Sequence, residues 1–132
     1  MIALDTNVLA RYLLNDDPVQ ARAASALLAL EKNYTAPPTV MLELVWVLRT
    51  NGCDRNEILK GLRLLLGLPN FRPLAFEALC YALRWFEEGM DFGDALHLAM
   101  SADEDSFITF DKSLGKLANQ LGAMPATKIL ST

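Results

Sequence analysis

Two aspartates directly follow apolar segments that we predict to be strands. Asp5 closes the segment 2–4, and Asp111 closes the segment 106–110. In parallel α/β sheets, ligands bind outside the carboxyl ends of the strands. We therefore expect both carboxylates to project over the same edge of one sheet. Taken alone, either aspartate is better explained as the N-cap of the helix that follows it.

A third carboxylate lies within an apolar helical segment. The neighbours of Glu43 on the same face of the predicted helix are Val40, Trp46 and Val47, all apolar. Burying a lone carboxylate costs several kcal/mol unless a cation or hydrogen-bond donors meet it. We therefore expect Glu43 to bind a metal ion or to pair with one of the 12 lysines and arginines.

Two further aspartates begin the segment DFGDALHLAM, which has the pattern of a helix. Asp91 is placed to be the N-cap, and Asp94 falls in the first turn, near the positive end of the helix dipole. Asp94 projects from the edge of a helix that is otherwise mostly core, so it is the better functional candidate. His97 lies one turn further on, but without companion Cys or His ligands it predicts no zinc site.

Together, these carboxylates indicate a site with oxygen ligands only. Mg²⁺ and Mn²⁺ prefer such ligands, whereas zinc and copper favour nitrogen and sulfur. One or two such ions can activate a water molecule and stabilise the leaving oxygen of a phosphodiester. Crowded carboxylates also repel one another, so at least one should have a raised pKa in the absence of metal. The ligand type therefore points to phosphate chemistry.

The expected elements alternate between strands and helices. An Asp-Pro pair at 17–18 predicts a helix to about residue 32, a Pro-Pro pair at 37–38 a helix to 49, and Asp54 a helix to 67. Short strands or extended pieces are expected at 2–4, 34–36, 71–74, 106–110 and 126–130. No hairpin pattern occurs, so we predict the α/β class: a central parallel sheet of about four to five short strands flanked by helices, in one domain spanning 1–132.

Composition limits the class of protein. The chain has 132 residues, of which 52% are hydrophobic and 21% charged, as expected of one globular domain. A net charge of −4 argues against a plain RNA binder, which normally needs a basic face. It argues less against a metal enzyme, because bound cations would neutralise the clustered carboxylates.

Location and association follow from the remaining residues. Cys53 and Cys80 are far apart in sequence and are expected to be buried free thiols. With no signal peptide and no apolar run near the roughly 18 residues that span a bilayer, we expect a cytoplasmic protein and no membrane contact. The surplus of apolar side chains predicts an oligomer, with Trp46 and Trp85 as candidate anchors.

These motifs resemble those of the PIN-domain ribonucleases, and specifically the VapC-type toxins of type II toxin–antitoxin pairs. The resemblance rests on IALDTN at 2–7, LELVWVL at 42–48, DFGDALH at 91–97 and TFD at 109–111. It implies that the core acidic positions are Asp5, Glu43 and Asp94, with Asp111 as a fourth. It also implies hydroxyl positions at Thr6 and Thr109 and an accessory acid at Asp91, which either touches a metal ion or only caps its helix.

The resemblance further implies an activity and its partners. The protein would be a Mg²⁺- or Mn²⁺-dependent endoribonuclease, acting as a toxin homodimer whose cognate antitoxin lays its C-terminal segment across the active-site groove. RNA would have to be held by local patches, for which the candidates are Arg11, Arg49, Lys112 and Lys116. The alternative is a catalytically silent α/β interaction module, in which the acids are only helix caps and solubilising charges. Divalent-metal binding separates the two interpretations.

Overall fold

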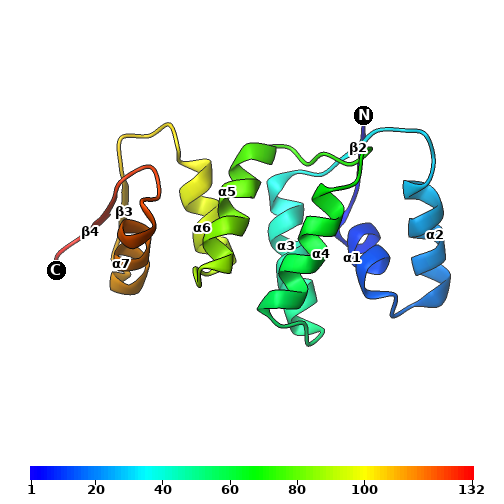
Figure 1. The fold of residues 1–132 in the computed structure, drawn as a ribbon, viewed down its shortest axis with the longest axis horizontal. Helices are drawn as coiled ribbons and strands as arrows, with labels where there is room; N and C mark the ends of the chain where they lie inside the picture. The colour runs from blue at the N-terminus through cyan, green and yellow to red at the C-terminus, as the bar shows by residue number, and fades with distance from the viewer. The chain divides into compact units, whose positions relative to one another are not determined.

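The computed structural model describes residues 1–132, which form two compact units (Figure 1). Unit 1 is Met1–Phe76 and unit 2 is Glu77–Thr132. Each unit is described by itself below. No helix in either unit is both long enough and apolar enough to cross a membrane.

Unit 1 contains two short strands and four helices. The elements are β1 (Ile2–Ala3), α1 (Thr6–Leu14), α2 (Pro18–Leu28), β2 (Tyr34–Thr35), α3 (Pro38–Thr50) and α4 (Arg55–Leu66). The predicted caps are present: the Asp17 side chain accepts hydrogen bonds from two backbone amides at the start of α2, and Asp54 forms a capping box with Glu57 at the start of α4. Helix α2 ends at Leu28, before residue 32, because the Leu30 amide already bonds only three residues back, to Leu27.

Strand β1 pairs with β2 in parallel, and Ala3 lies opposite Thr35. The segment after α4 adds a single parallel bridge on the other side of β2, between Tyr34 and Phe71. Helix α1 packs against both α2 and α3 and lies between them (Figure 1). Leu9 of α1 and Leu44 of α3 are completely buried there. This packing holds the end of β1, and with it Asp5, in a fixed setting.

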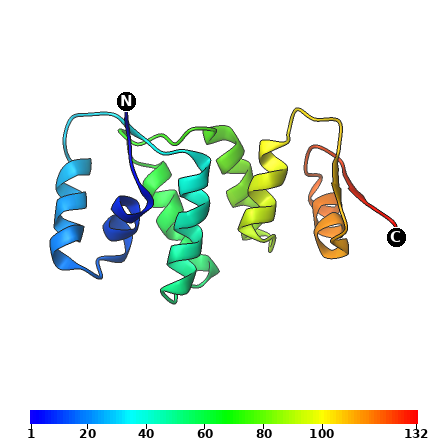
Figure 2. The same ribbon diagram turned by 180° about the vertical axis from the view of Figure 1, so that it is seen from behind.

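Unit 2 contains three helices and two strands. The elements are α5 (Phe76–Glu87, which begins at the last residue of unit 1), α6 (Phe92–Met100), β3 (Phe107–Thr109), α7 (Lys112–Leu121) and β4 (Thr127–Ile129). Helices α5 and α6 lie side by side, joined by a turn in which Gly89 has a φ of +109° (Figure 2). The rings of Phe86 and Phe92 meet edge to face, 5.7 Å between centroids. Strands β3 and β4 are parallel and α7 connects them.

The parallel direction of the strands is confirmed, but the predicted single sheet of four to five strands is not formed. The structure has two sheets of two strands each. In unit 1, Arg72 and Leu74 donate their amide hydrogens to Tyr34 and Ala36. The amide of the intervening Pro73 would face the opposite side, but proline has no N–H to offer a further strand. The 71–74 segment is therefore unsuited to pair on its outer side.

Both cysteines are free, as predicted, but the prediction of buried thiols is wrong. Cys53 is only partly buried and Cys80 is exposed. Cys80 lies on α5 beside the positions that form its buried side, which include Leu79, Leu83 and Phe86. Burial raises the pKa of the Cys53 thiol, and the carboxylates of Glu57 and Asp54 raise it further.

The contact between α7 and β4 gives a first prediction. A Cβ added at Gly115 would lie 2.6 Å from Cγ1 and 2.9 Å from Cδ1 of Ile129. We expect Gly115→Ala to lower the free energy of unfolding by about 1 kcal/mol, because the overlap outweighs the roughly 1 kcal/mol that alanine gains in a helix. Urea unfolding measures this.

The matched control is Gly61→Ala in α4, where the new Cβ would lie 3.2 Å from Cδ1 of Leu13, at the end of a flexible side chain. We expect this variant to be as stable as the parent or slightly more stable. Adding Ile129→Ala to Gly115→Ala should cancel the loss caused by the overlap. A single variant Gly115→Ala that is more stable than the parent would contradict the packing described here.

Candidate functional site

The carboxyl end of the β1–β2 pair carries three polar side chains. Asp5 is exposed and caps α1, accepting a hydrogen bond of 2.7 Å from the Thr6 amide. Thr6 is only 2% exposed, and its Oγ1 has no hydrogen-bond partner. The same holds for Oγ1 of Thr35, which is also buried. A buried hydroxyl without a partner costs about 1–3 kcal/mol, so this strand end keeps polar groups that the fold itself does not use.

Glu43 does not lie where the sequence argument placed it. The buried side of α3 consists of Met41, Leu44, Val45 and Leu48, whereas Glu43 is exposed. The expectation of a buried lone carboxylate is therefore wrong. Helix α3 has apolar residues on more than one side. The side that carries Glu43 is exposed to solvent.

The acids of unit 2 are positioned by two helix starts. Asp91 caps α6, and its Oδ2 accepts a hydrogen bond of 3.1 Å from the Asp94 amide. Asp111 caps α7, accepting one of 3.0 Å from the Leu114 amide. The Asp111 amide in turn donates to Oγ1 of Thr109 at 3.0 Å. The capping role expected of Asp91 and Asp111 is confirmed, and Thr109 fixes the backbone at the start of α7.

Asp94 is the electrostatically perturbed member of this group. Burial raises the pKa of its carboxyl group above 3.8, the negative charges of Asp91 and Asp111 raise it further, and His97 opposes the shift. Unit 2 therefore brings Asp91 and Asp111 within electrostatic range of Asp94. The expectation that one carboxylate would have a raised pKa is confirmed, although burial contributes more than crowding.

Neither unit gathers three His, Cys, Asp or Glu side chains closely enough to form a metal-binding group by itself. Asp5 and Glu43 belong to unit 1, and Asp94 and Asp111 to unit 2. A site with all four acids therefore stays a prediction. The chemistry of the donors fits a hard cation, because they are carboxylates and hydroxyls only, and a cation near Asp94 would relieve the repulsion that raises its pKa.

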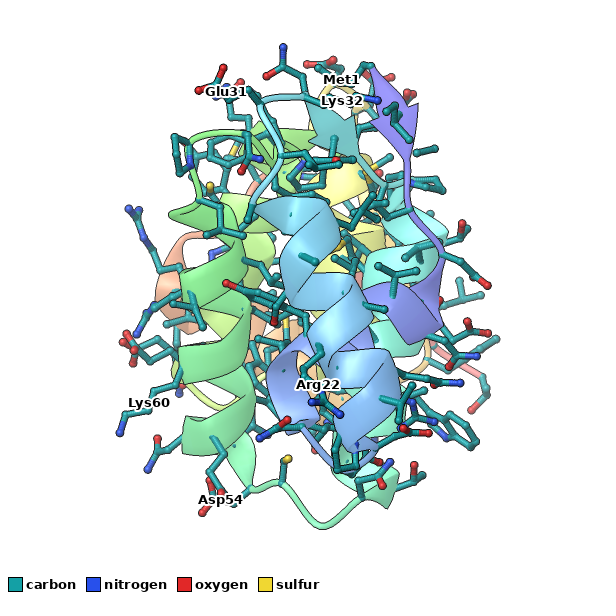
Figure 3. All side chains as sticks on the ribbon, turned by 90° about the vertical axis from the view of Figure 1, so that its right-hand side faces the viewer. Met1, Arg22, Glu31, Lys32, Asp54 and Lys60 are labelled. Carbon is teal, nitrogen blue, oxygen red and sulfur yellow. The ribbon has the colours of Figure 1, made fainter.

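The cations are distributed unevenly between the two units. Unit 1 has eight Lys and Arg against seven Asp and Glu, and unit 2 has four against nine, so their net charges are +1 and −5. Figure 3 shows Lys60 extending from α4 into solvent and Arg22 on the outside of α2. Of the predicted phosphate-binding residues, Arg11 pairs with Asp16 at 2.7 Å and would have to leave it to bind RNA. Arg49, Lys112 and Lys116 are exposed.

The sequence argument missed the unpartnered hydroxyl of Thr35. Thr35 is the last residue of β2 and lies inside the strand predicted at 34–36, so the rule that selected Asp5, which looks just after a strand, passed over it.

In a comparison with protein-family models, residues 2–120 match the PIN domain. No curated protein matches the chain.

The electrostatics of Asp94 predict how stability depends on pH. A carboxyl group whose pKa is raised by folding destabilises the folded protein wherever it is ionised in that state. Asp94→Asn should therefore raise the melting temperature of the metal-free protein at pH 7. The gain should shrink as the pH falls through the raised pKa and disappear below about pH 3.8, where the parent carboxyl group is protonated in both states.

The control is Asp103→Asn, which removes one exposed acid of unit 2 from the loop after α6. This variant should not reproduce the pH-dependent gain. Thermal melts of both variants and the parent from pH 3 to pH 8 measure it. Equal gains in the two variants would mean that only the net charge matters.

Proposed function

The chain belongs to the PIN domain family, and from this premise we propose that it is a Mg²⁺- or Mn²⁺-dependent endoribonuclease, the toxin of a toxin–antitoxin pair. PIN domains are generally nucleases. The observation that carries the proposal is the half-buried Asp94 beside Asp91 and Asp111, with its raised pKa. Groups perturbed by burial and by like charges are concentrated at functional sites.

We assign the metal-binding role to Asp5, Glu43, Asp94 and Asp111. A divalent cation held by carboxylates supplies an activated water molecule and neutralises charge on a phosphodiester. Thr6 is suited to hold a carboxylate or phosphate oxygen, because its buried hydroxyl has no other partner. Thr109 acts by position, since its hydroxyl fixes the amide of Asp111. Asp91 is satisfied as a helix cap, so we propose that it shapes the charge at Asp94 rather than binding metal.

RNA would be held by local cations. We propose contacts with phosphate oxygens from Arg49, Lys112 and Lys116, and from Arg11 after it leaves Asp16. The excess of cations in unit 1 favours phosphate contacts there, whereas the acids of unit 2 require a bound cation before a phosphate group can approach.

The alternative, a catalytically silent interaction module, explains part of the site. It accounts for Asp91 and Asp111 as helix caps. It does not account for Asp94, which is half-buried, has no basic partner nearby apart from His97, and is destabilised by its neighbours. The family match and this residue together favour the enzyme.

We propose further that the protein is a homodimer that binds a cognate antitoxin. Trp46 is suited to such a contact, because 63% of its surface is exposed on α3. The expectation that Trp85 is also an exposed anchor is wrong, since it is only 6% exposed and belongs to the core of unit 2.

The activity is tested with purified, antitoxin-free protein. Single-stranded and structured RNAs should be cleaved in Mg²⁺ or Mn²⁺, and chelation should stop the cleavage. Asp94→Asn and Glu43→Gln should each lower the rate at least about a hundredfold, because amides bind these cations poorly. Asp103→Asn, in the loop after α6 and outside the proposed metal site, should cleave at the parental rate. Full activity of both amide variants, or full activity after chelation, would disprove the metal-site assignment.

A separate experiment tests the exposed tryptophan. Trp46→Ser should shift sedimentation at micromolar concentration from dimer towards monomer, because the loss of a large apolar contact weakens an interface by about 2 kcal/mol or more. The melting temperature should stay close to that of the parent, because the side chain is exposed. Val19→Ser is the control, since Val19 is 70% exposed on α2. If Trp46→Ser remains as dimeric as Val19→Ser, this residue is not part of the interface.

A further inference from the structure

Unit 2 contains a cavity of about 670 Å³ that the proposed activity does not use. Its lining comes from α5, from the ends of α6 and α7 and from the residues just beyond those ends, and includes Tyr81, Trp85, Ala99, Ala102, Leu121 and Met124. This volume is within the range of pockets that hold ligands or anchoring side chains.

The cavity is separate from the acids described above. Asp94 lies in the first turn of α6, whereas Ala99 and Ala102 lie at and just beyond its other end. Asp111 precedes α7, and Leu121 is the last residue of that ten-residue helix. A helix of this length spans about 15 Å, so the cavity and Asp111 lie at opposite ends of α7.

The inner wall of the cavity is apolar and preformed. Trp85 is 6% exposed, and its ring lies 5.9 Å from that of Tyr81, tilted by 35°. Tyr81 is 47% exposed, and the guanidinium of Arg84 lies 5.8 Å from the centre of its ring. Met124 is 66% exposed at the rim. Aromatic residues and methionine that line an open pocket are typical of the centre of protein–protein interfaces.

The rim is acidic. Ala102 is followed directly by Asp103, Glu104 and Asp105, all exposed. Within the lining itself, the charges of Glu88 and Arg84 cancel. Unit 2 as a whole has a net charge of −5. The acids at 103–105 and the net charge of unit 2 therefore favour a basic occupant and repel the phosphates of RNA.

We propose that this cavity docks a basic segment of a partner protein. One aromatic or large aliphatic side chain of that segment enters between Tyr81, Trp85 and Met124. Lysines or arginines on either side of it face the acids at 103–105. This protein-binding site goes beyond the proposed ribonuclease activity and does not depend on it.

The experiment selects peptides from a random display library on the full-length protein. Ala102→Trp serves as the blocked target, because Ala102 is exposed and lines the cavity, so a tryptophan there fills it. Ala26→Trp is the matched control, since Ala26 is exposed on α2 of unit 1, outside the cavity. A triple variant, Asp103→Asn, Glu104→Gln and Asp105→Asn, removes the three negative charges beside Ala102 and keeps the size of the side chains.

Selected peptides should be rich in lysine and arginine and carry one aromatic or large aliphatic residue. Synthetic copies should bind the parent and Ala26→Trp equally and bind Ala102→Trp at least tenfold more weakly. The triple variant should also bind them more weakly, and binding to the parent should fall as salt rises. If the melting temperature of Ala102→Trp is well below that of Ala26→Trp, its binding result is set aside and the triple variant alone tests the proposal.

Four results would overturn the proposal. The first is that the selected peptides are acidic or uncharged, and the second is that they bind the parent and the variant that tests the proposal equally well. The third is that a single-stranded RNA oligonucleotide binds at the cavity in preference to the peptides. The fourth is that the protein is a dimer that Ala102→Trp dissociates and Ala26→Trp does not. RNA cleavage is measured in parallel. An inactive protein that still binds basic peptides would refute the ribonuclease and leave the docking site intact.

Discussion

Aspartate side chains that bind the first amides of helices are the interaction on which both units depend. Five of the seven helices, α1, α2, α4, α6 and α7, begin in this way. Each cap satisfies amides that the helix leaves unpaired and places a negative charge at the positive end of the dipole. Three of these aspartates, Asp5, Asp91 and Asp111, are also candidate site residues. Capping therefore fixes their positions before any ligand binds.

Sequence reasoning predicted these local features well. A helix cap depends only on residues close together in the sequence, such as an aspartate followed by proline or by an apolar periodic segment. Asp17 and Asp54 were therefore predicted correctly. The direction of the strands also followed from local patterns. The extent of the sheet did not, because it depends on which backbone amides remain free to pair. Pro73 has no amide hydrogen to offer on the outer side of the 71–74 segment. The sequence shows the proline, but only the structure shows that the amides on either side of it bond to β2.

Burial was the weakest prediction. Helical periodicity shows that a side of a helix is apolar, but not that another element covers it. Helix α3 has apolar residues around most of its circumference, and the protein covers the side of Leu44 while leaving Glu43 and Trp46 open. Trp85 shows the reverse outcome on α5. A buried hydroxyl without a hydrogen-bond partner does not by itself mark a site, because Thr127 of β4 has one as well. Such a hydroxyl points to a ligand only where carboxylates lie beside it.

The negative charge of unit 2 acts in different ways at the two ends of helices α6 and α7. At Asp94, burial disfavours the ionised carboxylate most and the charges of Asp91 and Asp111 add to this, so a small, hard cation beside it would offset both effects. Around the cavity, the acids at 103–105 are exposed and already hydrated, so they gain little from a single ion. They act instead over a longer range, on the approach of a large basic surface. The same excess of negative charge thus favours a metal ion at one end of α6 and α7 and a basic protein segment at the other.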